Sequence, residues 1–136
     1  MIVADANLVA YYYLPGSFQP LAQKIIQKDP VWFVPPILVS EFRNILLGFV
    51  RGKQLHKKDA IELAVRVELV FNQRTKGISS AQVMDLACDS GCSAYDSEYI
   101  ALAQMMGVKL VTNDKYLLNA FPKVAVSLED FLKISH

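Results

Sequence analysis

The chain has 136 residues with a formal net charge of +1, and 53% of its residues are hydrophobic. No apolar run reaches the roughly 18 residues that a membrane span needs, and the start lacks the basic region of a signal peptide. We therefore expect a cytoplasmic protein that does not associate with a membrane. The small net charge indicates no general attraction to nucleic acid. With only two histidines, His56 and His136, a histidine-based zinc hydrolase or a Ser-His-Asp triad has little to rest on.

Short apolar runs alternate with helical patterns along the chain. The first run ends at Asp5, and Pro15 and Gly16 stop the helical stretch that follows it. Pro36 suits the first turn of a later helix. The predicted strands are residues 1–4, 31–34, 109–112 and 124–126. The first predicted helix ends at residue 14, and one helix runs from a basic turn at 51–58 to about residue 73. The other predicted helices are residues 17–28, 36–51, 80–90, 94–106 and 113–120 and a closing helix that starts at residue 128.

This alternation predicts one α/β domain over residues 1–136, a three-layer α/β/α fold with a short, mostly parallel central sheet. No repeat, linker or low-complexity segment interrupts it. The mean hydropathy of +0.26 is high for a soluble monomer. The surplus of apolar residues therefore indicates a subunit or partner interface.

Two acids end predicted strands. Asp5 follows the run Ile2 to Ala4, and Asp114 follows the run at 110–113. Sites in open parallel sheets form beyond the carboxyl ends of the strands, near the point where the strand order reverses. An aspartate at a strand-to-helix junction is also a good N-cap, so both interpretations stay open for these two residues.

Two further acids share helical faces with apolar residues. Glu41 lies about 40° from Ile45 on the helix that follows Pro36. Asp96 shares a face with Tyr99 and other inward-facing residues. A carboxylate at the edge of a buried face is costly unless a cation meets it. Glu41 could instead extend outward or pair with a lysine, and Asp96 could complete a capping box with Ser93.

Four segments together resemble the PIN-domain nucleases, and among them the VapC-type toxins of bacterial and archaeal toxin–antitoxin pairs. The resemblance follows the chain in order over nearly its whole length. Its most specific segment is Ser93 to Ala103, whereas the segment around Asp5 would be weak alone. The matching segments are Val3-Ala4-Asp5-Ala6-Asn7, Ser40-Glu41-Phe42-Arg43-Asn44, Ser93-Ala94-Tyr95-Asp96-Ser97-Glu98-Tyr99-Ile100-Ala101-Leu102-Ala103 and Val111-Thr112-Asn113-Asp114-Lys115.

The resemblance implies a metal site and a reaction. In such proteins one or two Mg²⁺ or Mn²⁺ ions are held by carboxylates and activate a water that hydrolyses phosphodiester bonds in RNA. Asn7 and Thr112 would support the acids, and Thr112 would help to orient Asp114. Glu98, two residues from Asp96, is held in reserve. The implied catalytic and metal-binding residues are Asp5, Glu41, Asp96 and Asp114, and the implied supporting residues are Asn7 and Thr112.

The resemblance also implies partners: an RNA substrate, a homodimer and a cognate antitoxin protein. The apolar helices that contain Phe42 and Phe49 could form the dimer and the groove that an antitoxin fills. The basic run from Arg51 to Lys58 could contact phosphates, or it could be an ordinary solvated turn. The tyrosines at 11–13 could stack on a base or pack in the core or dimer.

Alternatives from other classes remain. A non-catalytic PIN-fold module that binds RNA or a partner protein would have the same fold, and metal dependence would separate the two. A haloacid-dehalogenase-type enzyme needs a second aspartate where Asn7 stands, and a receiver domain needs an aspartate where Pro35 ends the second strand. Cys88 and Cys92 could be free thiols or a strained local bridge, and a zinc site would need more ligands.

Overall fold

The computed structural model describes residues 1–135, and His136 lies outside the described residues. Four short parallel strands form the central sheet in the order β2-β1-β3-β4. Val3 of β1 is in register with Phe33 of β2 on one side and with Leu110 of β3 on the other. The strands are β1 (Ile2–Ala4), β2 (Trp32–Phe33), β3 (Leu110–Val111) and β4 (Ala125–Val126).

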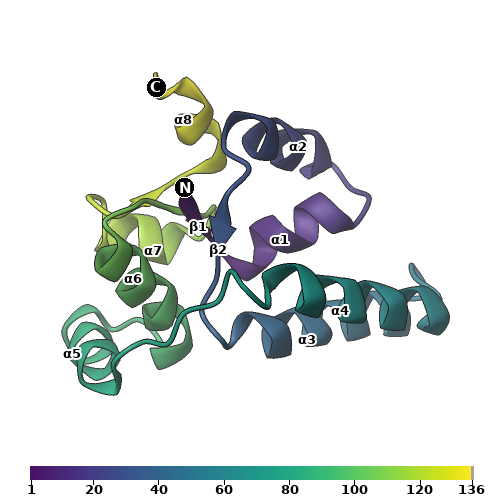
Figure 1. Cartoon of the computed structure of the whole chain (residues 1–136), viewed down its shortest axis with the longest axis horizontal. Coiled ribbons are helices and arrows are strands. Elements are labelled where there is room, and N and C mark those ends of the chain that lie inside the picture. Colours follow the sequence, from purple (N-terminus) through teal and green to yellow (C-terminus); the bar gives the residue numbers. More distant parts are fainter. Residues whose placement is uncertain (136) are drawn as a thin grey trace.

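The helices fill the connections between strands (Figure 1). Within residues 1–135 the elements follow the predicted order, and the differences are one or two residues at the ends of helices and strands. The helices are α1 (Ala6–Tyr13), α2 (Gln19–Lys28), α3 (Leu38–Arg51), α4 (Lys57–Phe71), α5 (Ser80–Ser90), α6 (Ala94–Met106), α7 (Lys115–Ala120) and α8 (Leu128–Lys133). No helix of the described residues is long and apolar enough to cross a membrane.

The connections run in opposite directions from the centre of the sheet. From β1 the chain crosses through α1 and α2 to β2 at one edge, and it then returns past β1 to β3 and β4. Since such crossovers are right-handed, the two directions place helices on opposite faces. Accordingly α6 packs on β1 and β3, while α1 and α2 pack on each other and α2 packs on α8. The predicted three-layer α/β/α fold is confirmed.

The core is continuous through the sheet, because every residue of β1 and β3 is buried. The antiparallel pair of α3 and α4 extends from the body as an arm in Figure 1. The order of strands reverses between the neighbours β1 and β3. Their carboxyl ends are therefore the place where the fold predicts a site.

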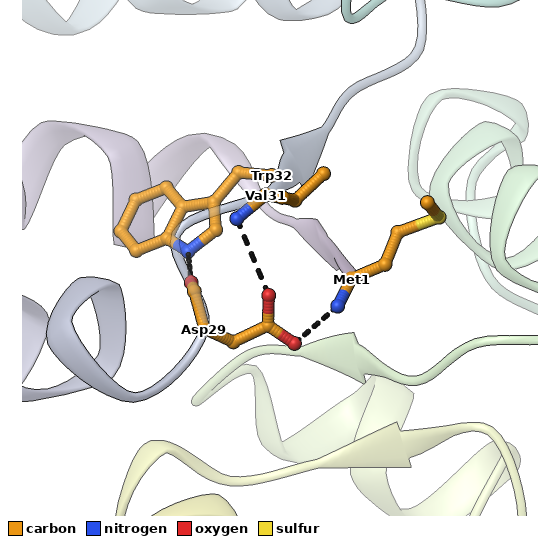
Figure 2. Close-up of polar contacts among 4 residues, drawn as sticks. All are labelled: Met1, Asp29, Val31 and Trp32. Atoms are coloured by element: carbon orange, nitrogen blue, oxygen red, sulfur yellow. Dashed lines mark hydrogen bonds and ion pairs between the residues drawn. The ribbon is translucent and has the colours of Figure 1, made fainter.

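The opposite end of the sheet is closed by an ion pair (Figure 2). The α-ammonium group of Met1 pairs with the carboxylate of Asp29, which is 8% exposed. The same carboxylate accepts a hydrogen bond from the backbone N–H of Val31 at 3.2 Å. The indole N–H of Trp32 donates to the Asp29 carbonyl at 2.8 Å. These contacts fix the start of β1 against the start of β2.

Candidate active site

Asp5 is the most deeply buried acid of the predicted set, with 7% of its surface exposed. It follows β1 and caps α1, since its Oδ1 accepts a hydrogen bond from the backbone N–H of Leu8 at 2.7 Å. Burial raises the pKa of Asp5 from 3.8 to about 6; hydrogen bonds from Thr112 and Leu8 oppose the rise, and the charges of Asp114 and Glu41 add to it. The capping interpretation is therefore correct but incomplete, because a cap does not require burial beside other acids.

Thr112 connects the first and last acids of the set. Its buried hydroxyl donates to Oδ2 of Asp5 and accepts from the backbone N–H of Asp114 at 3.0 Å. Asp114 in turn caps α7, with its Oδ1 accepting from the N–H of Leu117 at 3.0 Å. Thr112 is thus hydrogen-bonded to the side chain of Asp5 and to the backbone of Asp114, and its supporting role in catalysis stays a prediction.

Glu41 meets a tyrosine rather than a lysine. It lies in the first turn of α3 and is half-buried, and its Oε1 accepts a hydrogen bond from the hydroxyl of Tyr99 at 2.6 Å. Burial raises the pKa of Glu41, the Tyr99 hydrogen bond opposes this, and the charge of Asp96 adds to it. Burial, followed by the hydrogen bond and charge of Glu41, raises the pKa of Tyr99 far above its usual range. Tyr99 is therefore a permanent donor that holds Glu41 in place.

Asp96 lies in the first turn of α6, where its N–H donates to the Ser93 hydroxyl at 3.0 Å. Ser93 is the N-cap of α6, so the predicted capping interaction is present. Burial raises the pKa of Asp96, the charge of Asp114 adds to the rise, and a hydrogen bond with Ser93 opposes it. The pKa of Glu98, the acid held in reserve, is raised by burial and by the charge of Glu41.

The electrostatic couplings among the four predicted acids form a closed ring. The charges of Asp114 and Glu41 raise the pKa of Asp5. The charge of Asp96 raises the pKa of Glu41, and the charge of Asp114 raises the pKa of Asp96. We call these four residues the acid cluster. No lysine or arginine of residues 1–135 forms an ion pair with any of them. Burial is the largest cause of the raised pKa values of Asp5, Glu41 and Asp96, and repulsion by the neighbouring carboxylates adds to it.

The donor set suits a hard cation, but its geometry is not that of a preformed cage. Among residues 1–135, no three acidic, histidine or cysteine side chains are arranged to hold a metal ion as they stand. Protein donors occupy both oxygens of Asp5, Oε1 of Glu41 and Oδ1 of Asp114. The second oxygens of Glu41 and Asp114 accept no hydrogen bond within residues 1–135, and the Asp96 carboxylate has only Ser93 beside it as a donor. Oxygen ligands of this kind match those that Mg²⁺ and Mn²⁺ prefer, so the chemistry of the donor set fits such an ion.

The structure also shows the surroundings of Asn7, of the tyrosines at 11–13 and of the two cysteines. Asn7 is exposed on α1, and its side chain makes no hydrogen bond within the described part of the chain, so its supporting role stays a prediction. Tyr11 stacks on Phe18 with ring centroids 4.7 Å apart, and the two tyrosines after it make edge contacts with neighbouring rings. The tyrosines at 11–13 therefore pack within the protein. Cys88 and Cys92 are free thiols.

Tyr99 is the part of the site that sequence reasoning missed. The pattern placed it on the inward face of α6 with Asp96, but it did not indicate which residue of α3 its hydroxyl would meet. A buried tyrosine needs a partner for its hydroxyl, and a buried glutamate on a neighbouring helix needs a donor. The need of the tyrosine hydroxyl for a partner and of the glutamate for a donor was the only indication of this hydrogen bond in the sequence.

Comparisons with known proteins identify the family and the fold. The family model of the PIN domain matches residues 2–125, which confirms the resemblance inferred from the four segments. Ribonuclease VapC3 of Pyrobaculum aerophilum is 28% identical over 125 residues, covering 89% of this chain and 95% of that protein. The crystal structure of PAE2754 from Pyrobaculum aerophilum has a TM-score of 0.73 at 23% identity, covering 97% of this chain and 93% of that one. A toxin–antitoxin complex from Klebsiella pneumoniae has a TM-score of 0.67 at 16% identity, covering 94% and 98%.

Proposed function

We propose that this chain, which belongs to the PIN domain family, is a ribonuclease that hydrolyses phosphodiester bonds in RNA with one or two divalent ions, Mg²⁺ or Mn²⁺. The ligands are Asp5, Glu41, Asp96 and Asp114. The observation that supports this most is their closed ring of couplings without a paired cation among residues 1–135. A structural role would favour pairing such buried acids with lysine or arginine.

The chain's own residues divide the work. Thr112 and Tyr99 hold the carboxylates of Asp5 and Glu41. Ser93 caps α6 shortly before Asp96, and Asp114 itself caps α7. When bound, a divalent ion supplies an activated water and stabilises negative charge on the phosphate and the leaving oxygen. The described residues contribute no histidine to this site, which agrees with a reaction that proceeds without a covalent protein intermediate.

We further propose that residues 1–136 act as one nuclease domain and as the toxin of a toxin–antitoxin pair, working as a homodimer in the cytoplasm. The name of the relative Ribonuclease VapC3 supports the RNA substrate. The toxin–antitoxin complex with the same fold supports an antitoxin partner. An exposed apolar strip on the α3–α4 arm, formed by Leu47, Ile61 and Val65, supports an interface on that arm.

RNA cleavage by the wild type and by Asp96→Asn tests the function. We expect the wild type to cut RNA with Mg²⁺ or Mn²⁺, to lose activity in EDTA and to regain it when the metal returns. Asp96→Asn should lose about a hundredfold or more, as expected when a metal ligand is removed, and should fold as stably because it removes repulsion. Asp89→Asn, an exposed aspartate on α5, is the matched control and should cut at the wild-type rate. Equal cleavage by Asp96→Asn and the wild type would show that the site is assigned wrongly.

A further inference from the structure

Without a bound cation the acid cluster repels the backbone of its proposed substrate, and an ion held there would attract only the phosphate that enters the cluster. Its four carboxylates have no paired lysine or arginine among residues 1–135, and the whole chain has a net charge of only +1. Long-range attraction therefore contributes little to holding a polyanion near these residues. Other groups beside the cluster must bind the RNA strand.

Two tyrosines that are close in sequence to acids of the cluster are largely exposed. Tyr95 is 62% exposed and Tyr116 is 60% exposed. Neither ring contacts another ring or a cation within residues 1–135. The chain's four other tyrosines are buried or packed against the core. Rings left in water at two positions expose apolar surface that folding does not use.

Both tyrosines stand beside residues of the acid cluster. Tyr95 directly precedes Asp96 at the start of α6, and Tyr116 lies two residues after Asp114 on α7. A Cβ atom added at Gly91 would be 3.3 Å from the Tyr116 hydroxyl oxygen. Tyr116 therefore reaches the loop that leads into α6 and Tyr95.

A lysine completes this surface. Lys115 lies between Asp114 and Tyr116, is exposed, and forms no ion pair within the described part of the chain. Flat aromatic faces together with a free cation are the groups that bind single-stranded nucleic acid, because unpaired bases stack on the rings and the cation contacts a phosphate. Bases inside a duplex are already stacked and offer no free face to such rings.

We propose that Tyr95 and Tyr116 are stacking surfaces for unpaired bases of an RNA strand bound beside the acid cluster, with Lys115 contacting the backbone. This inference rests on the proposed ribonuclease function, since that function places RNA at the cluster.

Binding of a short fluorescein-labelled single-stranded RNA, followed by anisotropy in Mg²⁺, tests the inference. Asp96→Asn serves as the background because it leaves the RNA uncut. Changing both Tyr95 and Tyr116 to alanine should weaken binding about tenfold or more, whereas changing both to phenylalanine should keep it because the rings remain. Leu69→Ala on α4, which removes a 70% exposed apolar side chain far along the chain, should leave binding unchanged. The duplex of the same sequence should bind weakly to every variant.

Two results would overturn the inference. One is wild-type affinity in the folded double-alanine variant. The other is a double-alanine variant with a changed oligomeric state by light scattering and unchanged RNA affinity, which would make the surface an interface between protein copies. Failure of the proposed function is distinct: the wild type would cut no RNA with any metal, while ring-dependent binding of single strands could still be measured and would support the inference.

Discussion

The two ends of the central sheet each hold a buried aspartate, and the charged neighbours of these two aspartates are of opposite sign. Asp29, at the end where β1 begins, is 8% exposed and pairs with the Met1 ammonium group (Figure 2). Asp5, at the end where β1 finishes, is 7% exposed and has only neutral donors beside it. Its charged neighbours are Asp114 and Glu41, which repel it.

The comparison shows that burial alone does not separate a structural acid from a functional one. Asp29 has an opposite charge that offsets its burial, so its contacts explain its presence. Asp5 has a pKa raised to about 6, so its ionised form lowers the free energy of unfolding at neutral pH by about 3 kcal/mol. A chain that keeps such an acid beside others has a site that an external cation would stabilise.

The largest expected difference between the two ends is in pH dependence. Because the folded-state pKa of Asp5 is raised from 3.8 to about 6, the folded protein retains a proton there that the unfolded chain releases. The contribution of Asp5 to the free energy of unfolding is therefore greatest near the lower value and falls by about 3 kcal/mol as the pH rises through about 6. Glu41 and Asp96 act in the same direction, because their pKa values are also raised.

Thermal unfolding in EDTA at about pH 4 and about pH 7 measures this effect. We expect the metal-free protein to gain more stability on acidification than Asp5→Asn, in which the titrating group is absent. An identical pH response of the wild type and Asp5→Asn would show that Asp5 is ordinary in its protonation. Excess Mn²⁺ should raise the melting temperature most at the higher pH, where the carboxylates are ionised.

The next effect comes from removing the hydroxyl between the first and last acids. Thr112→Val keeps the shape of a buried side chain but removes the donor to Asp5 and the acceptor for the N–H of Asp114. We expect a loss of about 1–3 kcal/mol in the free energy of unfolding, from the buried groups left unpaired. RNA cleavage should fall roughly tenfold to a hundredfold, as for other groups that orient metal ligands. Denaturant unfolding and cleavage rates check the two parts, and Thr112→Ser, which restores the hydroxyl, should recover most of both.

The smallest effect is expected at the opposite end. Asp29→Asn leaves the Met1 ammonium group without its carboxylate, but Met1 is half exposed and water replaces much of the interaction. We expect a loss of about 1 kcal/mol in the free energy of unfolding and no change in RNA cleavage. A large loss of cleavage in this variant would mean that the two ends of the sheet are coupled.

Most of the fold could be predicted from the sequence because its determinants are local. The buried strands read as apolar runs, and Pro15, Pro35 and Gly91 mark ends of elements that the structure also ends. Helix starts were placed one or two residues early at Pro36 and Asn113, since a periodic pattern does not separate a cap from the first turn.

The candidate site was predicted less completely because its partners come from distant segments. Helical spacing placed Glu41 and Asp96 near buried faces, and only the resemblance joined them to the two strand-end acids. The Tyr99–Glu41 hydrogen bond joins residues on α6 and α3, and the hydroxyl of Thr112 reaches Asp5 across the sheet. Periodicity within one element contains no information about such pairings.

Calorimetric titration with Mn²⁺ tests the central claim most directly, because it measures occupancy of the acid cluster separately from RNA cleavage. The wild type should bind one or two ions saturably, Asp96→Asn should bind at least tenfold more weakly, and Asp29→Asn should bind as the wild type does. Equal Mn²⁺ affinity in the wild type and Asp96→Asn, or RNA cleavage by a wild type that binds no metal, would contradict the account.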